Sequence, residues 1–551
     1  MRALMQDTPL LISSMLDYAA RFHADSEVIS REPDGSVHRT SWGEVARRAK
    51  QLARALQALG IKAGDRVATL AWNTHRHLEL YYAVSGLGAV LHTVNPRLFP
   101  EQLTYIINHA EDKLLFFDVM FAPLVEKLRP ELPGVERLIA LTDARGAAAL
   151  LSGGRLPGLL TYDELCAAQP PDFTWPELDE RTASSLCYTS GTTGHPKGVL
   201  YSHRSTVLHS FAVCAADALG LSCRDSVLLI VPMFHANAWG IPYAAAMCGA
   251  KLVLPGHALD GPSVCELLQR EACTLSLGVP TVWLNFLAFL DQHPDRKPQT
   301  LRRVVIGGSA APRALIARMH ALGVEVHHLW GMTETSPVGT CGGLTRRTID
   351  LSPEQLIDLK VKQGRALYGV EIKIVDDTGR ELARDGRAFG LVKVRGPWTT
   401  SGYFKGEGGQ ILDEQGWFPT GDVATLDEGG YLQITDRAKD VIKSGGEWIS
   451  SIDLENAAVA HPAVHEAAVI GVRHPVWQER PLLLAVKKPG AVVSEDELIE
   501  FLAGKVAKWW LPDEVQFVSE LPHTATGKLH KLKLREQFKD YSLPETPRRR
   551  G

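Results

Sequence analysis

Helical and strand-forming stretches alternate regularly in the first half of the chain, and this alternation restricts the fold more than any other feature. Ser41 followed by Glu44 is a capping-box pattern at the start of an expected helix over 44–59, and Gly60 stands just past its end. A strand, a helix and another strand are expected next, at 66–71, 77–86 and 89–93. A helix that connects two strands is the usual crossover of a parallel sheet. The pattern therefore predicts an α/β fold of mostly parallel sheets covered by helices.

A chain of 551 residues is too long for one ordinary hydrophobic core, so at least two domains are expected. Between 390 and 435 the expected strands are short and separated by Gly-rich turns, and a compact unit with its own strands and helix follows from 436. Its elements are expected at 467–472, 481–486 and 494–503. The predicted parts are a large N-terminal domain with a small β subdomain at 1–435, a small mobile α+β C-terminal domain at 436–540, and a disordered tail at 541–551.

The overall composition argues against several classes of protein. A formal net charge of −4 leaves no basic excess for a nucleic-acid surface. All cysteines lie between Cys166 and Cys341 without a CxxC spacing, which argues against a zinc site and a disulfide framework and fits the reducing cytoplasm. Asp7 and Asp17 interrupt any continuous apolar core of a signal peptide. We therefore expect a cytoplasmic protein.

One segment, 226–250, contains no Asp, Glu, Lys or Arg and has about the length of a membrane span. It also contains Pro232, Pro242 and His235, which suit a buried strand, a loop and a helix better than a spanning helix. No membrane span is expected here.

The most specific local pattern is the run Tyr-Thr-Ser-Gly-Thr-Thr-Gly-His-Pro-Lys-Gly at 188–198. Its glycines allow tight turns that aim backbone N–H groups inward, and its hydroxyls and lysine add donors, so the run predicts a cradle for a polyphosphate. Strand-like residues at 185–188 and 199–201 place this loop at a sheet edge. In a Walker A motif the second glycine would fall on Pro196, and no Ser or Thr follows Lys197. A P-loop kinase or ATPase is therefore disfavoured.

Together with further motifs, the loop resembles the signature of the adenylate-forming superfamily, which contains acyl- and aryl-CoA synthetases, luciferases and peptide-synthetase adenylation domains. The further motifs are Pro-Met-Phe-His at 232–235, Gly-Gly-Ser-Ala-Ala-Pro at 307–312, Trp-Gly-Met-Thr-Glu-Thr at 330–335, Thr-Gly-Asp at 420–422, and Asp-Arg-Ala-Lys-Asp at 436–440 with Thr-Gly-Lys at 526–528. They follow the family's order over nearly the whole chain. The resemblance implies an AMP-forming reaction with ATP, Mg²⁺ and coenzyme A.

The first implied step is attack of a substrate carboxylate on the α-phosphate of ATP, where positioned cations and donors stabilise the developing charge. By resemblance, Lys528 bridges the carboxylate and the phosphate, and Thr333 donates to the α-phosphate. Glu334, with help from Thr189, is expected to hold Mg²⁺. The residues expected around the phosphates are Thr189, Ser190, Gly191, Thr192, Thr193, Gly194 and Lys197.

The same resemblance assigns the nucleoside and coenzyme A. Asp422 accepts from the ribose hydroxyls with help from Arg437, and Trp330 lies against the adenine face. The backbone expected at the adenine edge is that of Gly308, Ser309 and Ala310, with Gly331 beside it. In the second step the CoA thiol attacks the acyl adenylate after the small domain rotates about Lys439. The residues expected along the pantetheine tunnel are Lys443, Gly445, Gly446 and Trp448.

The acid itself is the least determined part of the prediction. His235 is expected to orient the carboxylate, and Trp239 resembles the tryptophan that gates a hydrophobic tunnel in bacterial fatty acyl-CoA synthetases. Gly331 and Val338 are expected to border the acid. The uncharged segment 226–250 favours an apolar acid. A medium- or long-chain fatty acid is the first prediction, a short-chain acid or 3-methylthiopropionate the second, and an aryl acid the third.

Two interpretations compete with a CoA ligase. A nucleotide-binding sensor without turnover would be expected to lack Lys528, Glu334 or Asp422, and all three are present. An adenylating enzyme that uses oxygen in place of CoA would share the same motifs. Only analysis of the reaction product would distinguish such an enzyme from a CoA ligase. Similar fatty acyl-CoA synthetases dimerise through the N-terminal segment, so a homodimer is also predicted, without a nucleic-acid partner.

Overall fold

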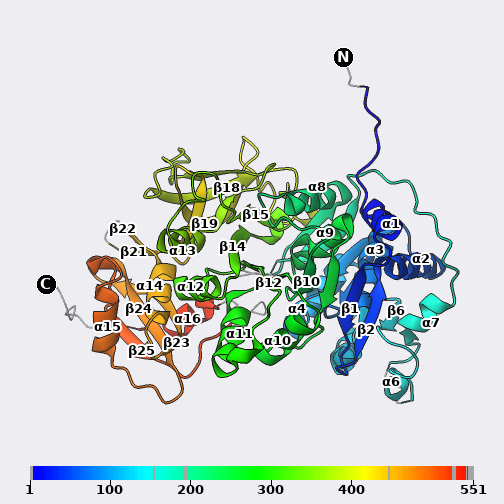
Figure 1. Cartoon of the computed structure of the whole chain (residues 1–551), viewed down its shortest axis with the longest axis horizontal. Coiled ribbons are helices and arrows are strands. Elements are labelled where there is room, and N and C mark those ends of the chain that lie inside the picture. Colours follow the sequence, from blue (N-terminus) through cyan, green and yellow to red (C-terminus); the bar gives the residue numbers. More distant parts are fainter. Residues whose placement is uncertain are drawn as a thin grey trace.

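The computed structural model describes residues 4–152, 156–189, 195–444, 447–523, 529–541 and 543, and at 447 and 448 it describes the backbone alone. Two large sheets and their helices form most of the molecule. A smaller third sheet with the C-terminal helices lies at the end far from the N-terminus (Figure 1). The fold is therefore the expected combination of a large α/β part and a small α+β part, while the boundary at 435/436 stays a prediction.

The first large sheet has seven strands in the order β7-β6-β5-β3-β4-β8-β9. Their bounds are β3 (Arg66–Leu70), β4 (Val90–Thr93), β5 (Asp112–Phe117), β6 (Arg137–Ala140), β7 (Leu160–Thr161), β8 (Ala183–Tyr188) and β9 (Gly198–Ser202). Neighbouring strands are parallel except β8 and β9, which are antiparallel. Strand β9 thus forms one edge of the sheet, and the segment expected to bind phosphate lies between β8 and β9.

The second large sheet has thirteen strands, β17-β18-β19-β20-β16-β15-β14-β13-β12-β10-β11-β1-β2. The strands of its parallel part are β1 (Glu27–Arg31), β10 (Ser226–Leu229), β11 (Lys251–Leu254), β12 (Leu275–Gly278), β13 (Arg303–Ile306) and β14 (Glu325–Gly331). The strands added antiparallel are β2 (Val37–Ser41), β15 (Val338–Cys341), β16 (Gly364–Ala366), β17 (Glu371–Val375), β18 (Phe389–Arg395), β19 (Phe418–Leu426) and β20 (Tyr431–Arg437). The expectation of mostly parallel sheets therefore holds for only half of this one.

The third sheet contains β21 (Ile442–Ser444), β22 (Glu447–Ile449), β23 (Val464–His474), β24 (Gln478–Lys487) and β25 (Glu514–Phe517). Its longest pair, β23 and β24, is antiparallel and contains the strands expected at 467–472 and 481–486. Helix α15 (Glu495–Ala503) covers it, and Ser494 forms a complete capping box with Glu497 at its start.

Helices cover the sheets on several sides (Figure 1). The remaining α-helices are α1 (Ile12–Phe22), α2 (Trp42–Ala58), α3 (His75–Gly86), α4 (Pro100–Ala110), α5 (Ala122–Leu128), α6 (Ala148–Ser152), α7 (Tyr162–Ala167), α8 (His203–Cys214), α9 (Ile241–Cys248), α10 (Gly261–Arg270), α11 (Pro280–Gln292), α12 (Arg313–Ala321), α13 (Pro353–Val361), α14 (Ser451–Val459) and α16 (Lys531–Gln537).

Local sequence patterns located several of these elements. The helix expected at 44–59 is α2, and Ser41 caps it by accepting from the Glu44 N–H. The Glu44 carboxylate pairs with Arg47, which corrects the second half of the capping-box prediction. The uncharged segment 226–250 forms β10, the short turn η3 (Ala236–Gly240) and α9, as predicted. No helix within the described residues is long and apolar enough to cross a membrane.

Helix α3 is packed on nearly all sides. All its residues except Arg76 are buried, and it contacts α1, α2, β1, β4 and β8. Such a helix fixes the first sheet to the edge of the second, because it contacts both. It also places Glu79 in the interior, where a carboxylate needs a cation and hydrogen bonds to be tolerated.

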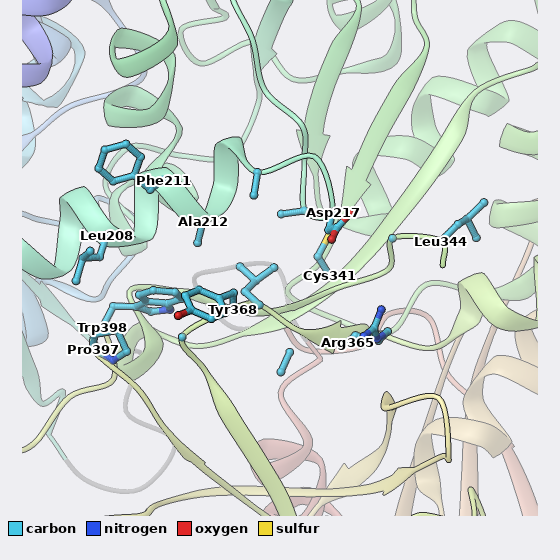
Figure 2. A pocket seen from close by; sticks show the side chains of 16 residues that line it. Leu208, Phe211, Ala212, Asp217, Cys341, Leu344, Arg365, Tyr368, Pro397 and Trp398 are labelled. Atoms are coloured by element: carbon cyan, nitrogen blue, oxygen red, sulfur yellow. The ribbon is translucent and has the colours of Figure 1, made fainter. Parts of the chain in front are cut away.

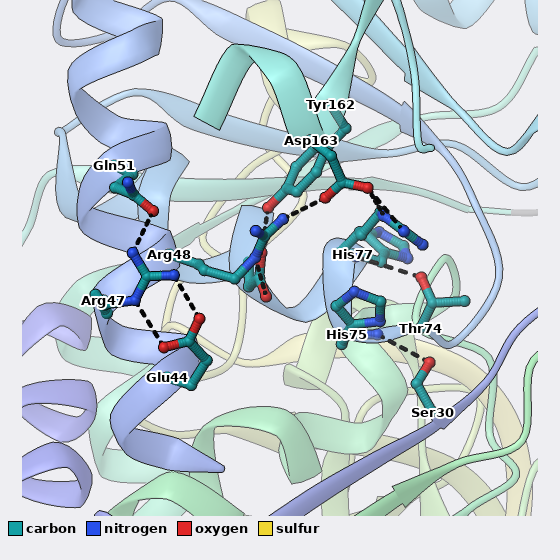
Figure 3. A network of polar contacts seen from close by, with 12 residues as sticks. Ser30, Glu44, Arg47, Arg48, Gln51, Thr74, His75, His77, Tyr162 and Asp163 are labelled. Atoms are coloured by element: carbon teal, nitrogen blue, oxygen red, sulfur yellow. Dashed lines mark hydrogen bonds and ion pairs between the residues drawn. The ribbon is translucent and has the colours of Figure 1, made fainter. Parts of the chain in front are cut away.

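Arg48 on α2 provides that cation (Figure 3). Its Nε lies 3.1 and 3.0 Å from the two oxygens of Glu79, and Tyr162 donates to the same carboxylate at 2.6 Å. Arg48 also reaches Asp163 at 2.5 Å, and Arg76 pairs with Asp163 at 2.8 Å. This network joins α2, α3 and α7 through charges that are largely removed from water.

The network yields a prediction about stability. Arg48→Met should lower the free energy of unfolding by about 3–5 kcal/mol, because it leaves the buried Glu79 carboxylate without its cation. The matched control Arg47→Met breaks an exposed pair with Glu44 and one hydrogen bond to Gln51, leaves no buried charge without its partner, and should change stability by about 1 kcal/mol. Thermal unfolding of both variants at one scan rate measures the difference. Equal shifts in Tm would contradict the role given to the network.

Candidate functional site

The strands that flank the expected phosphate loop hold its two ends together. The Thr189 N–H donates to the Lys197 carbonyl at 2.9 Å, and the Thr189 hydroxyl accepts from the Lys197 N–H at 3.1 Å. Gly198 begins β9 where a Cβ would lie 2.9 Å from Leu186 and 3.0 Å from Phe404, so a side chain there would displace its neighbours. The predicted residues Ser190, Gly191, Thr192, Thr193 and Gly194 lie outside the described residues.

Glu334 lies in a short turn, η5 (Thr333–Thr335), directly after β14. Its side chain is 6% exposed, and the Tyr403 hydroxyl donates to its Oε1 at 2.7 Å. Burial raises the pKa of Glu334, and the hydrogen bond from Tyr403 opposes that shift. The Thr333 carbonyl accepts from the Tyr201 hydroxyl at 2.7 Å, which attaches the turn to β9. The carboxylate is thus held beside the phosphate loop.

Tyr403 connects the two charged groups of the site. The Lys197 Nζ lies 5.0 Å from the centre of the Tyr403 ring, within cation–π range, while the hydroxyl of the same residue bonds Glu334. Sequence analysis missed Tyr403, because nothing local ties it to a turn 69 positions earlier. The only signal was an aromatic residue after Gly402 in a Gly-rich stretch. We call 403–409 the bridging loop.

The bridging loop is attached to α4 and to Glu111, the residue between α4 and β5. Tyr105 on α4 donates to Glu407 Oε1 at 2.9 Å, and Lys405 pairs with Glu111 at 2.6 Å. The ring of Tyr105 also stacks on His195, which belongs to the phosphate-loop motif, with centroids 4.3 Å apart. The small β subdomain therefore contacts the phosphate loop both directly and through α4.

Asp422 and Arg437 face each other on the paired strands β19 and β20. Arg437 Nε lies 2.7 Å from Asp422 Oδ1, and the indole N–H of Trp330 donates to Oδ2 at 2.8 Å. Asp422 is 3% exposed, whereas the Arg437 side chain is 42% exposed. Each carboxylate oxygen keeps further lone pairs, so Asp422 can still accept from the two hydroxyls of a ribose. The structure brings the three residues together in one cluster.

The expected adenine edge follows β13 at the carboxyl end of the parallel strands, the usual position for ligands in such sheets. Gly308 has φ +82°, which favours glycine, and Ser309 and Ala310 continue the turn. Gly331, at the end of β14, has no room for a side chain, because a Cβ would lie 1.9 Å from the Pro337 carbonyl oxygen.

The residues expected around the acid lie in and around η3. Four successive non-glycine residues of this turn have positive φ values between 42° and 57°: Ala236, Asn237, Ala238 and Trp239. Such a run is strained and needs support, which the Asn237 side chain supplies by donating to Ser185 Oγ at 2.8 Å. His235 is partly exposed at the start of η3, and Trp239 is 5% exposed and packs against Gly307.

His209 on α8 is a further residue at this end of the site, and sequence analysis missed it. Its Nε2 accepts from the Val338 N–H at 3.2 Å, and a Cβ on Gly240 would lie 2.6 Å from its ring. Burial lowers its pKa to about 3, so the imidazole is neutral and can accept this bond. A histidine six positions after His203 on an apolar helix gave no signal in the sequence.

The residues assigned to the second step are only partly described. Lys439 is exposed just after β20, where desolvation lowers its pKa and Asp440 opposes the shift. The Lys443 N–H donates to Glu479 at 3.0 Å, and Lys531 is held by Glu455 at 2.7 Å. Gly445, Gly446, the Trp448 side chain and Lys528 lie outside the described residues.

The site offers one buried carboxylate to a metal ion. No group of three or more His, Cys, Asp or Glu residues that could hold a metal occurs in the part of the chain that the structure describes. Mg²⁺ with nucleotide phosphates commonly takes only one or two carboxylates from the protein, so Glu334 with the hydroxyl of Thr189 fits this ion.

Comparisons with known proteins agree with the motifs. The model of the AMP-binding enzyme family matches residues 16–404, and that of the AMP-binding enzyme C-terminal domain matches 453–528. A 3-methylmercaptopropionyl-CoA ligase of Ruegeria lacuscaerulensis is 54% identical over 537 residues, covering 97% of this chain and 98% of the relative. A medium-chain-fatty-acid–CoA ligase of Ectopseudomonas oleovorans is 51% identical over 540 residues, covering 98% of each. The crystal structure of the anthranilate CoA ligase AuaEII with anthranoyl-AMP matches with TM-score 0.84 and 26% identity, covering 97% of this chain and 99% of that one.

Replacing Tyr403 should change the pH dependence of the reaction in a known direction. Tyr403→Phe removes a bond that lowers the pKa of Glu334, so burial raises that pKa further. If Glu334 acts as a carboxylate, the acid limb of the pH–rate profile moves to higher pH. At a pH well above that limb, the Mg²⁺ concentration for half-maximal rate should fall, because the ion no longer has to displace the Tyr403 hydroxyl from Glu334 Oε1.

The matched control is Tyr201→Phe, which removes a neutral hydrogen bond to the carbonyl of Thr333 in the same turn. It should leave the acid limb in place. An unchanged profile in Tyr403→Phe, or the same shift in both variants, would show that Tyr403 does not act through the Glu334 carboxylate.

Proposed function

The chain belongs to the AMP-binding enzyme family, and on that premise we propose that it activates a medium- or long-chain fatty acid as its AMP ester and transfers the acyl group to coenzyme A. It is an acid–CoA ligase, like the curated relatives that match it over almost their whole length. The observation that best supports the site is the convergence of Lys197 and Glu334 on Tyr403 beside the phosphate loop.

In the first step a carboxylate oxygen of the acid attacks the α-phosphorus of ATP, and pyrophosphate leaves. Lys197 and the loop N–H groups hold the phosphates, and the cation of Lys528 offsets the charge that gathers between carboxylate and phosphate. Thr333 donates to the α-phosphate. Mg²⁺ bound by Glu334 and Thr189 would neutralise the phosphate oxygens. Asp422 and Arg437 keep the ribose in place.

In the second step the CoA thiol loses its proton, its sulfur attacks the acyl carbon, and AMP leaves. The same family fold suggests that the small domain turns about Lys439 between the steps, withdrawing Lys528 and bringing 443–448 to the adenylate. The glycines at 445 and 446 would let the pantetheine pass close to the backbone.

The acid is proposed to be apolar along its length. Burial of η3 and α9, together with the absence of charge from 226 to 250, supports an alkyl chain. A short thioether acid is the second candidate, because the 3-methylmercaptopropionyl-CoA ligase is 54% identical to this chain. We also propose that the protein is cytoplasmic, because all eight cysteines are free thiols, as is usual in a reducing compartment. A homodimer is proposed as well, and sedimentation at micromolar concentration would test it.

The experiment that tests this function is CoA-dependent AMP release with acids of two to eighteen carbons, 3-methylthiopropionate and benzoate. A maximum of kcat/KM at medium or long chains is expected. A maximum at 3-methylthiopropionate would support the proposed reaction but would make this thioether acid, and not a fatty acid, the substrate. Pyrophosphate release without a CoA thioester would contradict the ligase itself.

Replacing Lys528 should impair the first step of the reaction and leave the second largely intact. Lys528→Ala should lower the rate of adenylate formation from free acid at least a thousandfold, because the charge between carboxylate and phosphate loses its cation. Thioester formation from supplied acyl-AMP should stay within about threefold of wild type, since the group is withdrawn by then. Lys533→Ala, an exposed lysine on α16, is the control and should change neither step. Equal loss of both steps in Lys528→Ala would contradict the rotation.

A further inference from the structure

Helix α4 places two rings beside the two ends of the phosphate-loop motif at 188–198. Tyr105 and His109 are four residues apart and therefore share one face of α4. The Tyr105 ring stacks on His195, near the end of the motif, with centroids 4.3 Å and planes 24° apart. His109 Nδ1 lies 2.7 Å from the hydroxyl of Tyr188, the first residue of the motif. One helix thus contacts the motif at both ends.

The rings form a continuous stack. His109 and Tyr105 are nearly parallel, with planes 12° and centroids 5.3 Å apart, so the stack runs from His109 through Tyr105 to His195. Phe404 of the bridging loop meets the His109 ring edge-on, with centroids 5.6 Å apart. Desolvation lowers the pKa of His109, so its imidazole is neutral at pH 7 and can accept from the Tyr188 hydroxyl. A neutral ring also packs against Tyr105 without removing a charge from water.

The contact at His195 lies outside the strand pairing of the sheet. The ladder between β8 and β9 ends at the pair Tyr188–Gly198, so His195 lies beyond it, and the stack on α4 adds a lateral attachment there. Pro196 restricts the backbone next to it, because its ring fixes its own φ and limits the conformations of His195. The position of the His195 ring is therefore passed on to the backbone of Lys197, from which the cation proposed to bind phosphate extends.

Tyr105 makes a second contact that can be separated from the first. Its hydroxyl donates to Glu407 Oε1 at 2.9 Å, which holds the bridging loop. The same loop presents Tyr403, whose ring centre lies 5.0 Å from the Lys197 cation. The hydroxyl thus acts on the loop that contacts Lys197, whereas the ring acts on the motif itself through His195. Removing the ring and removing the hydroxyl should therefore have different effects on nucleotide binding.

We propose that Tyr105 is a positioning residue for the nucleotide, and that its stack on His195 orders the end of the phosphate-loop motif before ATP binds. The proposal rests on the proposed function in one respect, since it needs Lys197 to meet the phosphates of ATP. Without the stack, this segment has to be ordered when ATP binds, and the loss of conformational freedom weakens binding. The weakening cannot exceed the contribution of the stack itself, which for one aromatic pair corresponds to about three- to tenfold in an equilibrium constant.

The test measures the Kd for MgATP by calorimetry, without acid or CoA. Tyr105→Leu removes the ring and should raise this Kd about three- to tenfold, the effect of one aromatic pair. Tyr105→Phe keeps the ring, loses only the hydroxyl that bonds Glu407, and should stay within about twofold of wild type. Thioester formation from supplied acyl-AMP needs no ATP, so its rate should stay within about twofold of wild type in both variants. A wild-type Kd in Tyr105→Leu, or equal weakening in both variants, would overturn the proposal.

Variants of His195 distinguish the stack from a direct contact between the imidazole and phosphate. His195→Leu should weaken ATP binding as Tyr105→Leu does, whereas His195→Phe keeps a ring and should bind within about twofold of wild type. If His195→Phe binds ATP as weakly as His195→Leu, the imidazole acts on phosphate by itself and the positioning role is wrong. The double variant Tyr105→Leu/His195→Leu should bind no more weakly than the weaker single variant, because both changes remove the same contact. Additive losses would contradict the stack.

The matched control is Tyr368→Leu (Figure 2). Tyr368 is 99% exposed beside a cavity of about 670 Å³ between α8 and β16, and none of the described residues that line this cavity belongs to α4, the phosphate-loop motif or the bridging loop. This variant should bind MgATP like the wild type, and a rise in Kd equal to that of Tyr105→Leu would overturn the proposal. A wild-type enzyme that binds MgATP but forms no CoA thioester with any acid would refute the proposed function alone, because the Kd values need neither acid nor CoA. If Tyr105→Leu does not fold, the variants of the exposed His195 still decide.

Discussion

Strand β14 is the element on which the rest of the site depends. It is parallel to β13 on one side and antiparallel to β15 on the other, so the doubly wound half of the large sheet changes into the small β subdomain at this strand. Trp330 and Gly331 end it, and the turn with Thr333 and Glu334 follows immediately. Because side chains at that end meet residues from both halves, one strand orients the adenine side and the phosphate side together.

The parts of this arrangement that the sequence could predict are those determined locally. The Ser41 cap, the alternation of strands and helices and the uncharged segment 226–250 are all properties of neighbouring residues, and each appears in the structure. The motif residues were found by resemblance, and Asp422 and Arg437 are in contact. Tyr403, Tyr201 and His209 could not be found in this way, because each acts on a residue 69 to 132 positions away. The thirteen-strand order depends on tertiary pairing and gave no local signal.

The turn η3 shows how a costly local conformation is maintained. Four adjacent non-glycine residues with positive φ cost roughly 1–3 kcal/mol each, so the turn exists only because its surroundings hold it. Asn237 provides part of that support through Ser185 on β8, and Gly240 continues the left-handed path where His209 leaves no space for a side chain. The strain places a polar residue and a tryptophan at positions that a regular helix would not reach.

The contacts of Tyr403 have a consequence for nucleotide affinity. In the structure the Tyr403 ring lies against the Lys197 cation, and the Tyr403 hydroxyl donates to the Glu334 carboxylate. Phosphate would use the same lysine, and Mg²⁺ would use the same carboxylate. The aromatic residue is in this sense an internal competitor. ATP does not bind to free charges; it exchanges one set of contacts for another, and the measured affinity is the difference between them. The protein therefore keeps a buried carboxylate and a nearby cation compensated between turnovers, at the expense of tighter binding.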